Sequence, residues 1–452
     1  MTDPAARLHL RKNLRSSIID GACFSTMVGL GETYFSAFVL AVSGSQVASG
    51  LVTTIPFLSG SILQLVSPRA VDAMNSHRRW VMTCVVTQSL SFLPLMAAAL
   101  AGHVPTAVVF LLAAVYWGGG MAAGSAWNTW MGRITLPRLR AGFFGFRTRV
   151  MQACTLLGVV AGGSALEWGK AAGYPVTIFA GLFFAAWLMR FISSRMLARM
   201  TEPPLTDDDH RVVPIRDVLS KFVGRDGRLF VYLLAVQFGQ QVAAPYFNPF
   251  LLKHLAFSYW EYTMLLAAAF IGRSASSAMW GQYARRFGTR SLLIVGGVGI
   301  IPLAALWMAS PSFWYLFGLQ FFAGAAWAAF DLANFLLYFE TIDAEERTSV
   351  LTAFNLFNGI SYVSGSLLGG LLLRSFGEGQ AAYEIVFGLS TLVRLATLSL
   401  LLRLPKYRMT SVPIATDPLA VRPSAGSIVR PDFVSLPDKA TSGLITDESP
   451  GR

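Results

Sequence analysis

Long apolar stretches alternate with short polar connections along almost the whole chain. A helix needs about 20 predominantly apolar residues to cross the hydrocarbon core of a bilayer. Stretches of roughly that length are residues 16–41, 46–67, 80–101, 105–131, 147–168, 174–196, 229–252, 259–283, 291–309, 312–338, 348–373 and 380–403. Polar turns separate them, for example at 43–45 and 377–379. The pattern predicts an all-α integral membrane protein with twelve transmembrane helices.

The apolar segments also repeat at about half of the chain length. The segment 34–40, with the sequence YFSAFVL, returns at 246–252 as YFNPFLL. Glycine and asparagine positions return in the same order, namely Gly118 with Asn128 as Gly324 with Asn334, and Gly162-Gly163 as Gly369-Gly370. Two related halves placed side by side are one design of a secondary transporter with a midplane site. We therefore expect two pseudo-symmetric bundles of six helices each.

Lysine and arginine side chains gather at one set of connections. They lie at 7–15, 69–79, 133–149, the central linker and 285–290, whereas the other connections hold little more than Lys170, Lys253 and Arg374. Basic loops stay in the cytoplasm, so both termini are predicted to be cytoplasmic.

This orientation divides the chain into five parts. We expect a cytoplasmic N-terminus at 1–15, a first bundle at 16–196, a cytoplasmic linker at 197–228, a second bundle at 229–403 and a disordered cytoplasmic tail at 404–452. An apolar stripe in the linker comprises Ile215, Val218, Leu219, Phe222 and Val223. It predicts an amphipathic helix on the membrane surface, with a plain solvated linker as the alternative.

Composition supports a membrane protein and argues against other classes. Hydrophobic residues make up 54% of the chain and charged residues 13%, against about 25% charged in soluble domains. The net charge of +12 comes from basic residues in short loops, whereas a nucleic-acid-binding face gathers them on one surface. The three cysteines lie inside apolar segments, and neither a phosphate-binding loop nor a His-Glu-x-x-His motif occurs. We expect no enzyme, metal site, cofactor or nucleic-acid partner.

Twelve spans, two parallel halves and cytoplasmic termini together resemble the major facilitator superfamily over about residues 16–403. The family signature between helices 2 and 3 begins Gly-x-x-x-Asp. Residues 68–72 keep the acid as Asp72, with proline at the glycine position. The resemblance implies that Asp72 holds the cytoplasmic gate closed, with Arg138, Arg140 or Arg147 as partners. A solvated loop carboxylate is the alternative.

Other glycine and arginine positions extend this resemblance. In the second half, residues 281–290 keep Gly281, Gly288 and Arg290, with Arg285 at the position of the acid. The connection 137–147 looks like the family's Pro-x-x-Arg-Gly type, and its counterpart 343–347 predicts a near capping box. Small residues at Gly158-x-x-x-Gly162-Gly163 and Gly365-x-x-x-Gly369-Gly370 let helices approach closely. The proline that family antiporters often carry in helix 5 is missing here.

Ionisable residues inside the spans are the candidates for coupling, because each is costly at membrane depth without a partner. Glu32 lies in helix 1, which lines the central cavity in the family, and a carboxylate there can load and release a proton as the cavity changes sides. A hydrogen-bonded structural glutamate is the alternative. Asp331 in helix 10 is a second proton-coupling candidate, or it neutralises Arg273 or Arg394 as a structural ion pair. An unpaired Arg273 would favour an anionic substrate.

Amide and aromatic side chains inside the spans are the candidates for substrate binding. With Arg273, they are Tyr34, Trp127, Asn128, Gln240, Gln241, Tyr246, Asn248, Asn334 and Asn358. Amides beside aromatic rings suit an uncharged or amphipathic organic solute. Only one face of each helix can meet a cavity, so we expect about half of the set to contact substrate.

The sequence therefore predicts a secondary active transporter of a small organic solute, working by alternating access. Our first interpretation is proton-coupled export of an amphipathic compound across the plasma membrane, in a bacterium the inner membrane, by a monomer. Proton-coupled or facilitated nutrient uptake, a membrane sensor that binds solute without moving it, and a lipid flippase remain alternatives.

Overall fold

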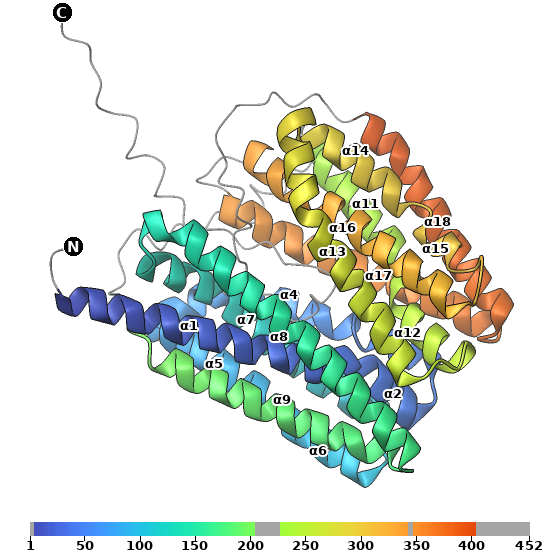
Figure 1. The fold of residues 1–452 in the computed structure, drawn as a ribbon, viewed down its shortest axis with the longest axis horizontal. Helices are drawn as coiled ribbons and strands as arrows, with labels where there is room; N and C mark the ends of the chain where they lie inside the picture. Colours follow the sequence, from blue (N-terminus) through green and yellow to red (C-terminus); the bar gives the residue numbers. More distant parts are fainter. Residues whose placement is uncertain (1–3, 204–226, 342–346, 404–452) are drawn as a thin grey trace, which may run out of the picture.

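The computed structural model describes residues 4–203, 227–341 and 347–403, and within these ranges the regular structure is helical throughout. The predicted amphipathic helix of the linker, the near capping box at 343–347 and the C-terminal tail fall wholly or largely outside the described residues. Two groups of helices, one from each half of the chain, make up the molecule (Figure 1).

The first half begins with a broken helix. Its elements are α1 (Pro4–Leu30), the 3₁₀ turn η1 (Glu32–Tyr34), α2 (Phe35–Ser43), α3 (Gln46–Leu51), α4 (Ile55–Met74), α5 (His77–Leu90), α6 (Phe92–Ala101), α7 (Thr106–Ile134), α8 (Pro137–Ala171) and α9 (Pro175–Ala198). The second half repeats this order. Its elements are α11 (Gly227–Ala243), the 3₁₀ turn η3 (Ala244–Tyr246), α12 (Phe247–Pro249), the π-helical turn η4 (Phe250–His254), α13 (Tyr259–Phe287), α14 (Thr289–Ile300), α15 (Leu303–Leu306), α16 (Phe313–Thr341), α17 (Arg347–Ser375) and α18 (Gln380–Leu402).

The twelve predicted spans all coincide with helical segments of the structure. Ten helical stretches of the described residues are long and apolar enough to cross a membrane. The remaining two predicted spans, 229–252 and 259–283, are also helical. The first is interrupted at Pro245, because a proline lacks the N–H that a continuing helix needs. The second, α13, is 29 residues long and carries charged side chains such as Arg273.

The repeat in the sequence corresponds to a repeated break in the structure. The first helix of each half stops, makes one 3₁₀ turn that ends in a tyrosine, and then continues. The hydroxyl of Tyr34 donates to the carbonyl oxygen of Val159 on α8 at 2.5 Å. The hydroxyl of Tyr246 donates to the carbonyl oxygen of Ser366 on α17, also at 2.5 Å. Equivalent residues of the two halves therefore make equivalent bonds.

Glycines bring the helices of each half into backbone contact, as their spacing predicts. A Cβ added at Gly158 on α8 would lie 3.0 Å from the Cα of Gly29 on α1. In the second half, a Cβ at Gly369 on α17 would lie 2.0 Å from the carbonyl oxygen of Val242 on α11. No side chain fits at so short a distance from a neighbouring backbone, so these helix pairs require glycine.

The two halves meet near one end of the molecule. In Figure 1 they come together around α2 and α12 and diverge toward the end where the N-terminus lies. Hydrogen bonds cross between the halves from Thr54 to Ser366 at 2.8 Å and from Gln46 to the carbonyl oxygen of Glu378 at 3.3 Å. On the orientation predicted from the basic loops, this joined end is the extracellular one.

Candidate functional site

A cavity of about 290 Å³ lies between the two halves. The interrupted helices supply much of its wall, through residues at the break after α1 and at the break between α11 and α12. Segments of α4, α7, α13, α15, α16, α17 and α18 supply most of the rest. Its volume is at the lower end for ligand pockets, which is suitable for a small solute.

Glu32 lies on the wall that the first half contributes. Its carboxylate is buried, with the residue 6% exposed, and it lines the cavity. The hydroxyl of Tyr116 on α7 donates to Oε2 of Glu32 at 2.6 Å. The ring of Tyr116 in turn packs edge-on against Phe35 and Phe92, each with a centroid distance of 5.2 Å. This aromatic cluster fixes the donor and, through it, the position of the carboxylate.

Arg273 and Asp331 face each other across α13 and α16. The guanidinium Nη1 of Arg273 lies 2.8 Å from Oδ2 of Asp331. Of the two arginines considered as partners for Asp331, Arg273 is therefore the one that forms the ion pair. Arg394 on α18 donates instead to the carbonyl oxygen of Ile300 at 2.7 Å and to Oγ of Ser390 at 2.9 Å. Both arginines border the cavity.

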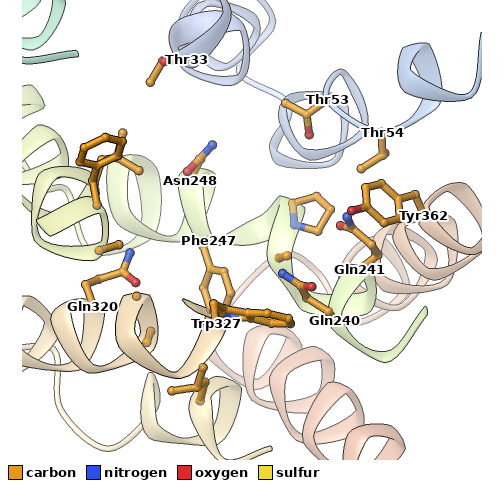
Figure 2. A pocket seen from close by; sticks show the side chains of 18 of the residues that line it. Thr33, Thr53, Thr54, Gln240, Gln241, Phe247, Asn248, Gln320, Trp327 and Tyr362 are labelled. Atoms are coloured by element: carbon orange, nitrogen blue, oxygen red, sulfur yellow. The ribbon is translucent and has the colours of Figure 1, made fainter. Parts of the chain in front are cut away.

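The cavity brings together some of the predicted substrate-binding residues. Gln240, Gln241, Asn248 and Arg273 line it. Figure 2 shows the three amides at the break between α11 and α12, on the wall that belongs to the second half. Thr33, Thr53 and Thr54 of the first half lie on the opposite side of the cavity in this view.

The other predicted binding residues are not among those that line this cavity. Tyr34 and Tyr246 are fully buried and bind the backbone of their own halves, as described above. Trp127 is also fully buried, beneath the guanidinium of Arg147 at 4.4 Å from the ring centroid. Asn128, Asn334 and Asn358 are buried, and each has one side-chain polar atom without a hydrogen-bond partner among the described residues. Their roles in binding stay predictions.

The predicted gate around Asp72 is only partly described. Asp72 lies exposed in the last turn of α4, and Arg140 lies on α8 with its side chain outside the described residues. Arg147, one of the partners considered for Asp72, is instead fully buried and forms an ion pair with Asp20 at 3.2 Å. The reason is its position on α8 beside α1, with the residue facing the interior of the first half.

The second copy of the gate motif joins α13 to α14. Gly288 has a φ of +86° and connects the two helices, a conformation that glycine adopts without steric cost. Gly281 lies on α13 with open space at its Cβ position, and Arg290 lies in the first turn of α14. The gating role of these residues stays a prediction.

Sequence reasoning missed several residues of the site. Tyr116, Thr33, Trp327 and Gln320 contact Glu32 or line the cavity. Gln320 had a usable signal, because it is a carboxamide inside the apolar span 312–338, as the predicted binding residue Asn334 is. Tyr116 had none, since a tyrosine inside an apolar span is common in ordinary helix packing.

A second polar cluster, formed by Asp20, Arg147, Ser193 and Arg190, lies away from the cavity lining within the first half. Ser193 Oγ donates to Oδ1 of Asp20 at 2.6 Å, and Arg190 Nη1 donates to Ser193 Oγ at 3.0 Å. Arg147 Nε donates to the carbonyl oxygen of Ser17 at 3.0 Å. The cluster ties α1, α8 and α9 together. No group of metal-ligating side chains suited to a metal ion occurs in the part of the chain that the structure describes.

Comparison with solved structures identifies the fold. A variant of the nucleoside transporter NupG superposes with a TM-score of 0.68 at 14% sequence identity, covering 86% of this chain and 99% of that one. The D-xylose-proton symporter gives a TM-score of 0.66 at 15% identity, covering 88% of this chain and 99% of that one. The sequence model of the Major Facilitator Superfamily matches residues 229–437.

The chain therefore has the fold of these transporters, and its second half is similar to the major facilitator superfamily. These matches confirm the resemblance inferred from its spans and its two halves, and the ten long apolar helices of the described residues agree with a multi-pass membrane protein. Among curated proteins, two from Arabidopsis thaliana match over 105 residues each. They are "Probable peptide/nitrate transporter", at 27% identity, and "Protein ZINC INDUCED FACILITATOR 1", at 29% identity. Each match covers 23% of this chain and 21% of the relative.

Proposed function

We propose that this protein is a secondary active transporter that exports a small amphipathic organic solute in exchange for protons. The observation that supports this most directly is the carboxylate of Glu32 on the cavity wall, bound by Tyr116. An ionisable group at membrane depth that reaches a solute cavity is suited to carry the coupling proton.

The arrangement of the two walls supports coupling as part of this proposal. Glu32 belongs to the first half, whereas the carboxamides Gln240, Gln241 and Asn248 belong to the second. A solute between the walls contacts both halves, so its binding and the protonation of Glu32 can bias the same rocking equilibrium. A ligand shifts such an equilibrium only by its differential affinity for the two states.

The test is a pH-dye measurement in proteoliposomes that contain the full chain. A mixed panel of drugs, peptides, sugars and organic anions is added, and solute-evoked proton flux is recorded. We expect a flux in the wild type that Glu32→Gln abolishes while solute exchange without a proton gradient persists, because glutamine keeps the shape but cannot release a proton.

The matched control is Glu384→Gln, which makes the same chemical change at an exposed position on α18. It should leave the flux unchanged. Normal proton-driven accumulation by Glu32→Gln would contradict the coupling role. Absence of any flux in the wild type would shift the proposal to a facilitator, a sensor or a lipid substrate.

Uptake is the alternative direction, because a solved protein with this fold is a D-xylose-proton symporter. The same proteoliposomes decide between the two. Export predicts that solute on the side of the cytoplasmic loops moves out as protons move in, whereas symport predicts that solute and proton move together. Sidedness is assigned by protease cleavage of the tail at 404–452.

A further inference from the structure

The ionic groups around the cavity already have protein partners. Arg273 is bound to Asp331 at 2.8 Å, and Arg394 donates to the carbonyl oxygen of Ile300 at 2.7 Å. Glu32 accepts the hydroxyl of Tyr116 at 2.6 Å. A charged ligand would have to compete for these groups and would lose part of its own hydration in doing so.

Three carboxamides that line the cavity, in contrast, have no hydrogen-bond partner among the described residues. Gln241 on α11, Asn248 on α12 and Gln320 on α16 make no hydrogen bond to any described residue of the chain. Gln241 is only 8% exposed. Asn248 and Gln320 are half-buried, so the three amides are free to bind a ligand that enters the cavity. Each carboxamide offers two N–H donors and one carbonyl acceptor, so together they are suited to a ligand that carries both donors and acceptors.

Aromatic rings lie between these polar groups. Figure 2 shows Phe247 and Trp327 with Asn248 and Gln320 on one side and Gln241 on the other. The Phe247 ring packs against Trp307 and Phe387, at centroid distances of 4.4 and 4.8 Å. The rings provide an apolar surface for the middle of a ligand whose two ends form hydrogen bonds.

We infer that the solute is an uncharged ring compound with hydrogen-bond donors and acceptors at both ends, held by Gln241, Asn248 and Gln320. This rests on the proposed function, whose substrate class it specifies. It adds Gln320 as a specificity-determining residue. It also excludes organic anions as the substrate class, which an unpaired Arg273 would have favoured.

The experiment measures ligand-induced thermal stabilisation of the purified full chain in detergent, because a ligand that binds the folded state raises the midpoint of unfolding. The probes are uncharged ring compounds, each with a charged counterpart of the same ring. They are nicotinamide with nicotinate and 1-methylnicotinamide, uridine with its 5′-monophosphate, and glucose with glucuronate and glucosamine. We expect stabilisation by at least one uncharged member and less by its charged counterparts.

Variants then assign the site. Gln241→Leu, Asn248→Leu and Gln320→Leu should each weaken binding of that uncharged probe about three- to ten-fold, as expected for one hydrogen bond. Gln88→Leu is the matched control, because Gln88 is also a buried carboxamide without a partner among the described residues, but it lies on α5 away from the cavity lining. It should leave the affinity unchanged.

Three results would overturn the inference. They are stronger stabilisation by a charged counterpart, no stabilisation by any uncharged probe, and an equal loss of affinity in Gln88→Leu.

Failure of the proposed function is a separate outcome. Binding needs no flux, so an uncharged probe that binds without evoking proton movement would contradict coupled transport alone. A charged solute that evokes coupled flux would keep the transporter and exclude the uncharged class.

Discussion

Individual residues at membrane depth are held by partners far away along the chain. Arg273 meets Asp331 across 58 residues, and Arg147 meets Asp20 across 127 residues. Asp20 and Arg147 are both fully buried, so each charge depends on the other. Such a pair adds little when it replaces apolar packing, yet removal of one partner leaves an uncompensated charge in an apolar environment.

Asp20→Asn should therefore destabilise the first half of the molecule. We expect a loss of about 3 kcal/mol in unfolding free energy, because Arg147 would keep its charge without its counter-ion. The measurement is thermal unfolding in detergent, followed by size-exclusion chromatography. The double variant Asp20→Asn with Arg147→Met removes both charges and should recover part of the loss. Equal stability of wild type and Asp20→Asn would contradict this account.

At the scale of elements, the broken helices perform two tasks in each half. The 3₁₀ turns η1 and η3 end in Tyr34 and Tyr246, which bind the backbones of α8 and α17. The same breaks place Glu32, Pro245 and Asn248 at the cavity. Glycines on α8 and α17 make room for these contacts. The tyrosine at each break can therefore reach the neighbouring helix only because that helix carries glycine there.

Gly369→Ala should disturb the pairing of α17 with α11. Its Cβ would lie 2.0 Å from the carbonyl oxygen of Val242, and a backbone atom cannot rotate away. We expect a cost of about 1–3 kcal/mol from overpacking, measured as a lower midpoint of thermal unfolding. Gly388→Ala on α18 is the matched control, because open space surrounds its Cβ position. A similar loss in both variants would show that the close approach is not responsible.

At the scale of the whole molecule, the two halves are joined at one end and separate toward the other (Figure 1). The bond from Thr54 to Ser366 at 2.8 Å connects α17 to the segment just before α4. Alternating access requires this joined end to open in the opposite state. A covalent link at this point should therefore hold the protein in the observed state.

Thr54→Cys with Ser366→Cys, in a background without Cys23, Cys84 and Cys154, tests this requirement. The two hydroxyl oxygens lie 2.8 Å apart, so the cysteine side chains that replace them start from positions that face each other. Oxidation should abolish the solute-evoked proton flux, and a reducing agent should restore it, with each single-cysteine variant as a control. Full flux with the disulfide shown to be formed by mass spectrometry would contradict a rocking motion at this contact.

The sequence by itself determined the class of the molecule. Long apolar stretches require helices in a bilayer, because no other open structure satisfies the backbone there. The repeat of 34–40 at 246–252 required two related halves, and glycine spacing predicted close helix pairs, which Gly158 and Gly369 make. These features depend on local pattern and period, which a single chain displays directly.

Only the tertiary structure decided which polar residues share a site. The periodicity of a helix shows which residues share a face, but not which part of the molecule that face packs against. From the sequence, Gln241 and Tyr246 were therefore both candidates for substrate binding, whereas in the structure Gln241 lines the cavity and Tyr246 binds the backbone of α17. Partners such as Tyr116 for Glu32 come from another helix, 84 residues away. The distance between two such side chains depends on how whole helices pack against each other. That packing results from many weak contacts between segments far apart in the chain, which a local sequence pattern does not show.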